Sequence, residues 1–284
     1  MPKPRFIQIN DLTFLVRSAG NPDDPLVMFL HGFPETSIMW SNLMEEAAAK
    51  GFYCLAPDMR GYTAGACPGS VKSYTIDKLQ QDVIDIASAV KREKFHLVAH
   101  DWGAAIGWSV VNNNPKRIIS YSALSVPHNS AFGKAYRIDK EQKKKSRYIG
   151  FFLLPFIPEW VLRSGDFSKF RKLWKRSSPE ELEEYLTVFR RKGTIRGALN
   201  YYRANIGKGK GERIGKIKTP TLFIWGNRDL AISRAAAVEN APYMIGEYTF
   251  LEVDGGHWLI QSNYQEVREA ILKHLLRHQD TGNQ

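Results

Sequence analysis

Short apolar segments alternate with helical patterns along most of the chain. Four of these segments are rich in β-branched and aliphatic residues and end at turn formers, which is typical of buried strands: PLVMFLHG (25–32), FYCLAPD (52–58), FHLVAHD (95–101) and RIISYSALSVP (117–127). The segment SYTIDKLQQDVIDIASAVKRE (73–93) has apolar residues at helical spacing, and Ser73 and Thr75 near its start are candidate caps. This alternation predicts right-handed β-α-β units, and therefore an α/β fold with a mostly parallel sheet flanked by helices.

The pattern changes in the middle of the chain. From 128 to 213 the strand signals vanish, and aromatic and basic residues mix in helical stretches such as SPEELEEYLTVFRRKG (178–193). Strands return at TPTLFIWGNRD (219–229) and EYTFLEVDGGH (247–257), followed by a closing helix near 263–277. We therefore expect two domains: an α/β core formed by residues 1–127 and 214–284, and an inserted helical cap formed by residues 128–213.

Composition limits the class of protein. A chain of 284 residues that is 43% hydrophobic can bury a large core, which excludes disordered and fibrous classes. The two cysteines, Cys54 and Cys67, are too few for a disulfide framework and lack the spacing of a zinc site. The first residues, MPKPRFIQIND, contain no apolar signal core, and no run of about 18 apolar residues occurs. We expect a cytoplasmic protein without a transmembrane segment or bound metal.

The formal net charge of +11 raises nucleic acid or an anionic membrane surface as a partner. The densest basic runs, at 141–147 and 208–218, carry no nucleic-acid-binding motif, so we expect a solvated basic surface and no nucleic-acid partner. The first run directly precedes the apolar run IGFFLLPFI (149–157), which is too short to span a membrane and contains Pro155. Weak association with a membrane surface therefore remains open.

The stretch LVAHDWGAAIGW (97–108) places an acid where the third buried strand turns into a helix. Ala99 and Gly103 lie two positions either side of Asp101, as a sharp strand-to-helix elbow requires, because larger side chains would collide there. Such an elbow usually presents a serine. The chain contains no G-x-S-x-G, which argues against a serine-type esterase. Asp101 is the candidate nucleophile, and the alternative is a buried structural acid or an N-cap.

Partners for Asp101 follow in the order that such a fold requires. Asp229, in WGNRDLAIS, comes after one late strand, and His257, in DGGHWLIQ, comes after the next, which gives nucleophile, acid and base along the chain. The other candidate acids are Asp254 and Glu252, close to His257 in sequence, whereas the segment 121–131 contains no carboxylate. We interpret four other histidines as structural: His96, His128, His274 and His278.

With these residues in place, the chain resembles the epoxide hydrolases of the α/β-hydrolase fold over nearly its whole length. HGFPE (31–35) is similar to the HGxP loop of that family, which implies an oxyanion hole formed by the backbone N–H groups of Phe33 and Trp102. DMRGY (58–62) resembles the segment after the fourth core strand. The family also has two tyrosines in its inserted cap, and Tyr148 and Tyr202 are similar to that pair. Tyr201, next to Tyr202, is the position most easily confused with it.

The motifs HGFP and HDWG are also shared with haloalkane dehalogenases, so a haloalkane or haloacid dehalogenase with the same Asp-His-Asp triad is the alternative enzyme. An aspartate with a pKa of about 3.9 is already ionised and can attack a saturated carbon to form an alkyl ester. A halide leaving group needs N–H donors, whereas an epoxide oxygen becomes an alkoxide and needs a proton, which a phenol can supply. The best-known dehalogenases have Asn in place of Phe33, so the tyrosines favour the epoxide.

These observations lead to a specific expectation. Asp101 attacks the epoxide, Tyr148 and Tyr202 protonate its oxygen, and His257, oriented by Asp229, activates water to hydrolyse the ester to a vicinal diol without a cofactor.

The expected partners are then a small apolar epoxide and water. Phe33, Trp102 and Phe152 are expected to contact the substrate, and an apolar substrate is suggested by the cap aromatics Phe151, Phe152, Phe156 and Trp160. A non-catalytic binding protein would have no reason to keep all these groups. The oligomeric state, monomer or homodimer, is left open.

Overall fold

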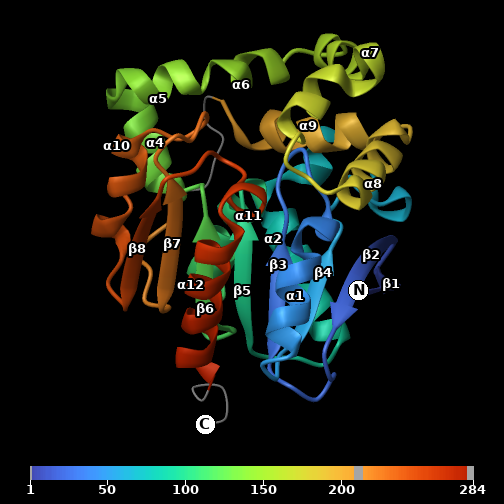
Figure 1. The fold of residues 1–284 in the computed structure, drawn as a ribbon. Coiled ribbons are helices and arrows are strands. Elements are labelled where there is room, and N and C mark those ends of the chain that lie inside the picture. The colour runs from blue at the N-terminus through green and yellow to red at the C-terminus, as the bar shows by residue number, and fades with distance from the viewer. Residues whose placement is uncertain (1, 208–213, 280–284) are drawn as a thin grey trace.

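The computed structural model describes residues 2–207 and 214–279. Within these residues the centre of the molecule is an eight-stranded sheet with the order β1-β2-β4-β3-β5-β6-β7-β8 (Figure 1). Strands β3 to β8 pair with one another in parallel, and they coincide with the six segments that the sequence predicts as strands, so the mostly parallel α/β architecture is confirmed. The strands are β1 (Lys3–Ile9), β2 (Leu12–Ala19), β3 (Leu26–Leu30), β4 (Tyr53–Pro57), β5 (Phe95–His100), β6 (Ile118–Leu124), β7 (Thr221–Gly226) and β8 (Tyr248–Val253).

The first two strands were not expected from the hydrophobic pattern, which predicts no element before residue 25. β1 pairs antiparallel with β2, and β2 pairs antiparallel with β4, so they extend one edge of the sheet. Only part of this hairpin is buried: Phe14 and Val16 are in the core, whereas most of β1 is exposed. An edge hairpin of this kind lacks the continuous apolar run that marks the central parallel strands.

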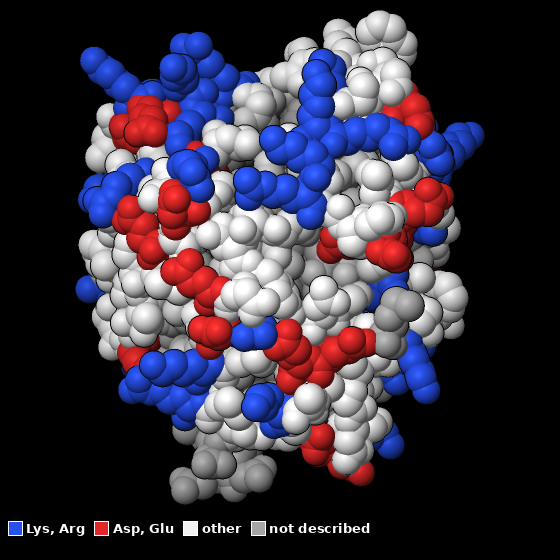
Figure 2. Space-filling view, in the orientation of Figure 1, with Lys and Arg blue, Asp and Glu red and all other residues white. Residues whose placement is uncertain are grey.

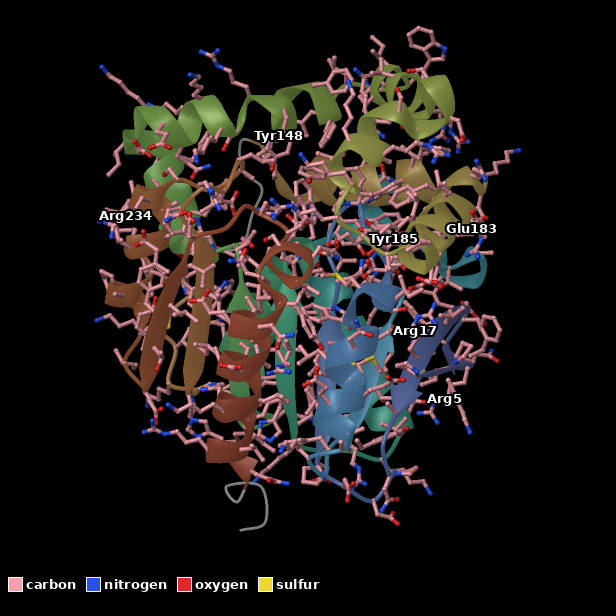
Figure 3. The ribbon with its side chains drawn as sticks, viewed as in Figure 1. Arg5, Arg17, Tyr148, Glu183, Tyr185 and Arg234 are labelled. Carbon is pink, nitrogen blue, oxygen red and sulfur yellow. The ribbon has the colours of Figure 1, made fainter. Side chains whose placement is uncertain are left out.

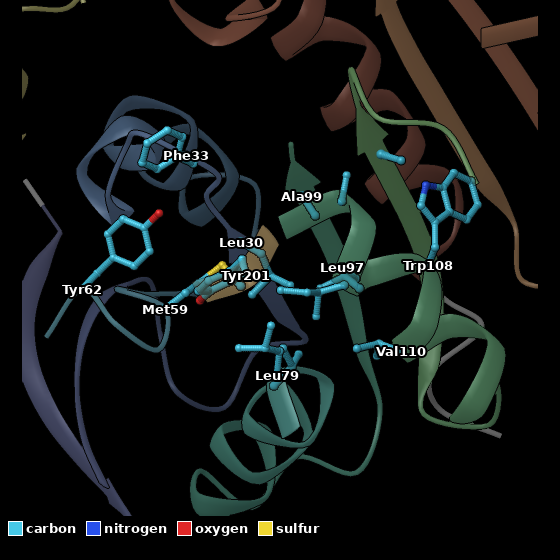
Figure 4. Close-up of a cluster of buried hydrophobic side chains, with 14 of the residues drawn as sticks. Leu30, Phe33, Met59, Tyr62, Leu79, Leu97, Ala99, Trp108, Val110 and Tyr201 are labelled. Carbon is cyan, nitrogen blue, oxygen red and sulfur yellow. The ribbon is translucent and has the colours of Figure 1, made fainter. Parts of the chain in front are cut away.

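Helices cover both faces of the sheet. On one face lie α1 (Ser41–Ala48) and α12 (Tyr264–Arg277), which stand in front of the sheet in Figure 1 and bury Leu43 and Ile271 against it. On the other face lie α2 (Ile76–Ala89) and α3 (Trp102–Asn113), and Figure 4 shows Leu79 and Val110 from these helices beside Leu97 of β5. The shorter elements on the core are η1 (Ser37–Trp40), η2 (Ala64–Ala66), η3 (Val71–Tyr74), α10 (Arg234–Val238), η4 (Ala241–Tyr243) and α11 (Leu259–Ser262).

The start of α2 differs from the prediction. The expected helix over 73–93 is divided into η3 and α2, and neither Ser73 nor Thr75 caps α2 with its side chain. The backbone N–H of Ile76 instead donates to the side-chain oxygen of Asn205, at 2.8 Å. The cap for this helix therefore comes from a residue 129 positions away, which no local pattern can show.

Between β6 and β7 the described elements are all helices: α4 (Asn129–Ile138), α5 (Lys140–Lys145), α6 (Arg147–Phe152), α7 (Ile157–Leu173), α8 (Pro179–Arg190) and α9 (Thr194–Asn205). They lie across the carboxyl ends of the parallel strands, at the top of Figure 1, and we call them the cap. Ser178 and Glu181 form a capping box at the start of α8. The expected domain limits stay a prediction. Residues 208–213, which include the expected end of the cap and part of the second basic run, lie outside the described residues.

Side chains of the cap bind directly to the core. The indole N–H of Trp174, at the end of α7, donates to the carbonyl oxygen of Pro34 at 2.9 Å. Glu184 of α8 accepts a hydrogen bond from the hydroxyl of Thr36 at 2.7 Å and forms an ion pair with Arg17 of β2, which Figure 3 labels. Pro34 and Thr36 flank Glu35 in the loop after β3, so the cap is fixed on the loop that contains the HGFP motif.

Trp108 of α3 provides a test of this packing. Its side chain is fully buried, its indole N–H donates to the Val126 carbonyl at 3.0 Å, and its ring contacts Tyr121 edge-on. We expect Trp108→Ala to lower the free energy of unfolding by about 3–5 kcal/mol, measured by urea denaturation. Trp160→Ala is the control, because Trp160 is 74% exposed, and its effect should stay within about 0.5 kcal/mol. Equal denaturation midpoints for the two variants would contradict this assignment of the core.

Candidate active site

Asp101 lies at the sharp turn between β5 and α3, with φ 52° and ψ −119°. This left-handed backbone is uncommon for a residue other than glycine, and close packing maintains it. A Cβ atom on Gly103 would lie 2.4 Å from the carbonyl oxygen of Leu30, and one on Gly32 would lie 2.3 Å from the Cβ of Asp101. Asp101 occupies the N-cap position of α3, but its side chain makes no capping hydrogen bond, so the N-cap alternative is wrong. The carboxylate is free to face other groups.

The structure brings Asp101, Asp229 and His257 together. The Nδ1 atom of His257 lies 2.8 Å from Oδ2 of Asp229, and its Nε2 atom lies 3.3 Å from Oδ2 of Asp101. The other oxygen of Asp229 accepts hydrogen bonds from the amides of Ala231 and Ile232, at 2.7 and 3.0 Å. Asp229 is therefore fixed by the backbone on one side and orients the imidazole on the other.

The alternative acids are engaged elsewhere. Asp254 is exposed and forms an ion pair with Arg228 at 3.2 Å, and Glu252 forms one with Arg234 at 2.9 Å. The geometry thus selects Asp229 as the carboxylate on His257. Two of the histidines interpreted as structural are also bonded away from this triad, His96 to Ser120 and His128 to the carbonyl of Gly215.

The charges of this buried group depend on one another. Burial alone would lower the pKa of His257, but the carboxylates of Asp229 and Asp101 outweigh it and raise this pKa to about 10. Burial would raise the pKa of Asp101, but the hydrogen bond and charge of His257, with the Phe33 amide, hold it below its usual value. At neutral pH the pair is therefore an imidazolium and a carboxylate.

The two oxygens of Asp101 have different partners. The backbone N–H of Phe33 donates to Oδ1 at 2.7 Å, whereas Oδ2 faces His257. Trp102 is the first residue of α3, and the amide of a first helical residue has no acceptor within its own helix. The predicted oxyanion donors, Phe33 and Trp102, thus lie next to the carboxylate, and the Phe33 amide already contacts one of its oxygens.

Tyr148 of α6 and Tyr202 of α9 face each other, with ring centroids 6.2 Å apart. Figure 3 shows Tyr148 on the side of α6 that faces the sheet. The ring of Tyr202 also lies edge-on to Trp102 at 5.0 Å and to Phe33 at 6.0 Å. Burial, reinforced by the negative charge of Asp101, raises the pKa of both tyrosines. Both are therefore neutral phenols that can donate a hydrogen bond, and both lie close enough to Asp101 for its charge to affect their pKa.

Tyr201 has a different environment. Its hydroxyl donates to the carbonyl oxygen of Arg60 at 2.7 Å, so it attaches α9 to the core. Its ring packs against Tyr62 and Tyr74. Since this hydroxyl is already used, the geometry favours Tyr202 over its neighbour as the second phenol of the site.

The aromatic side chains of the cap are divided between its two sides. Phe152 packs edge-on against Phe33 at 5.6 Å and lies 5.1 Å from Tyr202, so it belongs to the group around the carboxylate. Phe156 and Trp160 do not: they are 70% and 74% exposed on the outer surface. Phe156 and Trp160 therefore give no support to the apolar substrate that the cap aromatics suggested, because spacing along the chain does not show which side chains of the cap face inward.

Two buried polar residues were missed by sequence reasoning. Oε2 of Glu35 lies 3.1 Å from Nδ1 of His100, and both side chains are fully buried. Nε2 of His100 donates to the backbone carbonyl of His257 at 2.9 Å, and Ser125 donates to the same oxygen at 2.7 Å. The second oxygen of Glu35 accepts from Gln261 at 2.7 Å. This network fixes the backbone of His257. The only sequence signal for Glu35 and His100 was their position within the motifs HGFPE and LVAHDWG.

His31 joins the segment HGFPE (31–35) to the segment DMRGY (58–62) in space. Its Nε2 atom accepts a hydrogen bond from the Met59 amide at 2.9 Å, and its Nδ1 atom lies 3.0 Å from the carbonyl of Gly32. Burial lowers the pKa of His31 to about 4, so the ring is neutral and can act as an acceptor. The loop after β4 thereby holds the loop after β3 in place.

The described residues contain no cluster of three His, Cys, Asp or Glu side chains that could hold a metal ion. Across residues 2–207 and 214–279 there is also no helix of the length and apolarity needed to cross a membrane.

Comparison with known proteins gives one family. The model of the alpha/beta hydrolase fold matches residues 25–264. The chain is 30% identical to the AB hydrolase superfamily protein YfhM of Bacillus subtilis (strain 168), over 96% of this chain and 98% of that protein. It is 32% identical to Epoxide hydrolase 3 of Mus musculus, over 91% of this chain and 73% of that protein. A crystal structure of Bacillus megaterium epoxide hydrolase with an inhibitor is similar with a TM-score of 0.87 and 25% identity, covering 96% and 100% of the two chains.

The charge coupling at this site can be measured. Asp101→Asn removes one of the two anions that stabilise the His257 imidazolium, so we expect the pKa of His257 to fall by about one to three units from its value of about 10. Titration of 15N-labelled histidines by NMR would show this, with the His257→Gln spectrum as the assignment. Asp254→Asn, which removes an exposed carboxylate, should leave the titration unchanged. An unchanged His257 pKa in Asp101→Asn would mean that the two groups are not coupled.

Proposed function

The chain belongs to the alpha/beta hydrolase fold family and, within it, to the epoxide hydrolases, and we propose that it converts an apolar epoxide to a vicinal diol through a covalent ester on Asp101. One observation carries this proposal. A buried carboxylate is contacted from the core by an amide and an imidazole, while two neutral phenols lie above it on the cap. A nucleophile with acid groups on its far side is the arrangement that opening an epoxide ring requires.

In the first step, Oδ2 of Asp101 attacks a ring carbon while the Phe33 amide stays on Oδ1. The bond between that carbon and the ring oxygen breaks, and the oxygen takes a proton from the phenols of Tyr148 and Tyr202. Because the carboxylate is ionised before the substrate arrives, this step needs no base. The products of the step are a neutral ester and a phenolate.

Ester formation changes the state of His257. The ester has no charge, so His257 loses one of the two anions that raise its pKa, and its proton replaces the one that the phenol gave up. The neutral imidazole, still oriented by Asp229, can then remove a proton from water that attacks the ester carbonyl. The Phe33 and Trp102 amides stabilise the resulting oxyanion.

Collapse of this intermediate breaks the bond between the carbonyl carbon and the diol oxygen, and that oxygen takes the proton from His257. Asp101 is left as a carboxylic acid and returns its proton to the imidazole, which restores the starting pair. The sum of the steps is one epoxide and one water converted to one diol, without a cofactor.

The surroundings of the carboxylate support an apolar substrate. The rings of Phe33, Trp102 and Phe152 lie beside the two phenols, and their contact surface is aromatic. The cytoplasmic location stays a prediction, which is supported by two cysteines that are both free.

A direct test compares the two leaving groups. We expect the protein to convert styrene oxide to its diol, measured by chromatography, and to release no halide from bromoalkanes under the same conditions. Asp101→Ala should abolish diol formation, whereas Asp254→Ala should behave like the wild type because that carboxylate is exposed and paired with Arg228. Halide release without diol would favour a dehalogenase, and undiminished turnover by folded Asp101→Ala would remove the nucleophile.

The phenols are tested by removing their hydroxyls. Tyr148→Phe and Tyr202→Phe should each slow ring opening about 10²-fold, because one donor to a developing oxyanion contributes about that much, and the double variant should be nearly inactive. Single-turnover kinetics with styrene oxide would measure the step. Tyr201→Phe is the matched control: it loses its hydrogen bond to Arg60 and some stability, but should open the ring at nearly the wild-type rate. The reverse ranking would assign the acid to Tyr201.

The two halves of the mechanism separate in His257→Gln. Since Asp101 attacks without a base, the variant should form the ester and fail to hydrolyse it, releasing no diol after one equivalent of substrate. Intact-protein mass spectrometry should show the mass of one added substrate, and peptide analysis should place it on Asp101. Asp229→Asn should trap the ester less completely. Absence of an adduct in folded His257→Gln, with normal diol formation by the wild type, would indicate direct attack by water.

A further inference from the structure

A compact group of apolar side chains is exposed on the outer surface of the cap. Thirteen large apolar side chains are exposed in the described part of the chain, and five of them lie within eight residues of one another in sequence. We call these five the cap apex: Leu153, Leu154, Phe156, Ile157 and Trp160. Contiguous exposed apolar surface of this kind is unusual on a soluble protein unless something covers it.

The most exposed aromatic residues of the apex are held outward by the local backbone. Phe156 precedes α7 with φ 63°, a left-handed conformation that a bulky side chain rarely adopts, and its ring is 70% exposed. Trp160, one turn into α7, is 74% exposed. The backbone that connects α6 to α7 therefore directs the Phe156 side chain toward solvent.

Cations stand directly beside the apex. The guanidinium of Arg196 lies 5.8 Å from the centre of the Phe156 ring. Arg196 also lines a pocket of about 250 Å³ together with Arg163 and Lys192. The carboxylate in this pocket, Glu159, is bound by Arg203 through two hydrogen bonds, at 2.7 and 3.0 Å. The pocket thus offers cationic groups next to an apolar surface.

The helices around the apex carry a net positive charge. Helices α5 to α7, residues 140–173, contain nine Lys and Arg but three Asp and Glu, and each of these acids is in an ion pair with a basic residue. Figure 2 shows this side of the molecule: uncharged atoms stand at the top over α7, and Lys and Arg gather over α5 and in a band below. More than half of the net charge of +11 therefore comes from these three helices.

We propose that the cap apex docks on an anionic membrane surface, with its apolar side chains among the lipid acyl chains and the surrounding Lys and Arg at the phosphate headgroups. Aromatic and aliphatic side chains surrounded by basic ones are what an interfacial site requires. A second copy of the chain is a poorer occupant, because it would bring an equally positive surface against this one.

The position of the apex suggests how docking would help the enzyme reach its substrate, and this step rests on the proposed function. Helix α6 places Tyr148 and Phe152 against Tyr202, and the residues that follow, Leu153 and Leu154, belong to the apex. An apolar epoxide dissolves preferentially in a bilayer. Docking would therefore bring the segment that lines the substrate site next to the phase in which the substrate is concentrated.

Vesicle sedimentation tests the docking without any measurement of activity. We expect the wild type to bind vesicles of phosphatidylcholine with about 30 mol% phosphatidylserine, to bind phosphatidylcholine vesicles much more weakly, and to be released by high salt. The double variant Phe156→Ser/Trp160→Ser should bind at least tenfold more weakly. Its control, Phe6→Ser/Ile245→Ser, removes two exposed apolar side chains on β1 and before β8, and should bind like the wild type.

The charge contribution is tested by a matched pair of variants. Lys143→Gln/Lys144→Gln, on α5, should weaken binding by about thirtyfold, because each of the two charges contributes about 1 kcal/mol near an anionic surface. Lys50→Gln/Lys116→Gln removes the same charge away from the cap and should have little effect. The fluorescence of Trp160 gives a second readout: its emission should shift to the blue on binding, and Trp160→Phe should still bind without that shift.

Three results would overturn the docking proposal. The wild type fails to bind the anionic vesicles, the two pairs of lysine variants lose binding equally, or folded Phe156→Ser/Trp160→Ser binds normally. Sedimentation velocity adds another: a wild-type dimer that becomes monomeric in Phe156→Ser/Trp160→Ser would assign the apex to a second copy. If the vesicles bind but no epoxide is hydrolysed, the docking stands and the proposed function fails.

Discussion

The close approach of two loops at Asp101 is the constraint on which the rest of the site depends. Asp101 has a left-handed backbone between β5 and α3, and the chain packs closely around it because Gly32 and Gly103 lie where a Cβ atom would collide with neighbouring atoms. The same approach puts the Phe33 amide on Oδ1 of Asp101. A larger residue at either glycine would separate the loops, and the carboxylate would lose both its hydrogen bond from the Phe33 amide and its orientation toward His257.

Once Asp101 is fixed, its charge determines the state of its neighbours. As an anion it raises the pKa of His257 and of both phenols, so the site contains an imidazolium and two neutral phenols, which suits the proposed ring opening and does not suit the proposed hydrolysis. In the mechanism that we propose, ester formation removes that charge, and His257 loses one of the two anions that keep it protonated. The change from the first step to the second therefore needs no movement of the chain, because the chemical step itself changes the electrostatics.

The parallel strands and the triad could be predicted from the sequence because both depend on local patterns. Buried parallel strands are continuous apolar runs, and the residues at their carboxyl ends must meet at one edge of the sheet, which is why Asp101, Asp229 and His257 could be grouped from their positions in the chain. The edge hairpin β1-β2 has weaker patterns and was missed. Two other interactions join residues more than 60 positions apart and therefore leave no local signal. They are the hydrogen bond from Ile76 of α2 to Asn205 and the Glu35–His100 pair beside His257.

The cap shows most clearly what a sequence pattern omits. Its aromatic residues form one continuous group in the sequence, yet Phe152 contacts Phe33 and Tyr202 while Phe156 and Trp160, a few positions later, face solvent. The side on which each residue falls is set by the break between α6 and α7 at Phe156, and not by hydrophobicity, which is similar on both sides. With the docking that we propose, such a segment contacts two apolar environments, the aromatic side chains around Asp101 and the lipid at the apex. An insert selected for both would keep aromatic residues at solvent-exposed positions where stability of the folded chain alone gives no reason for them.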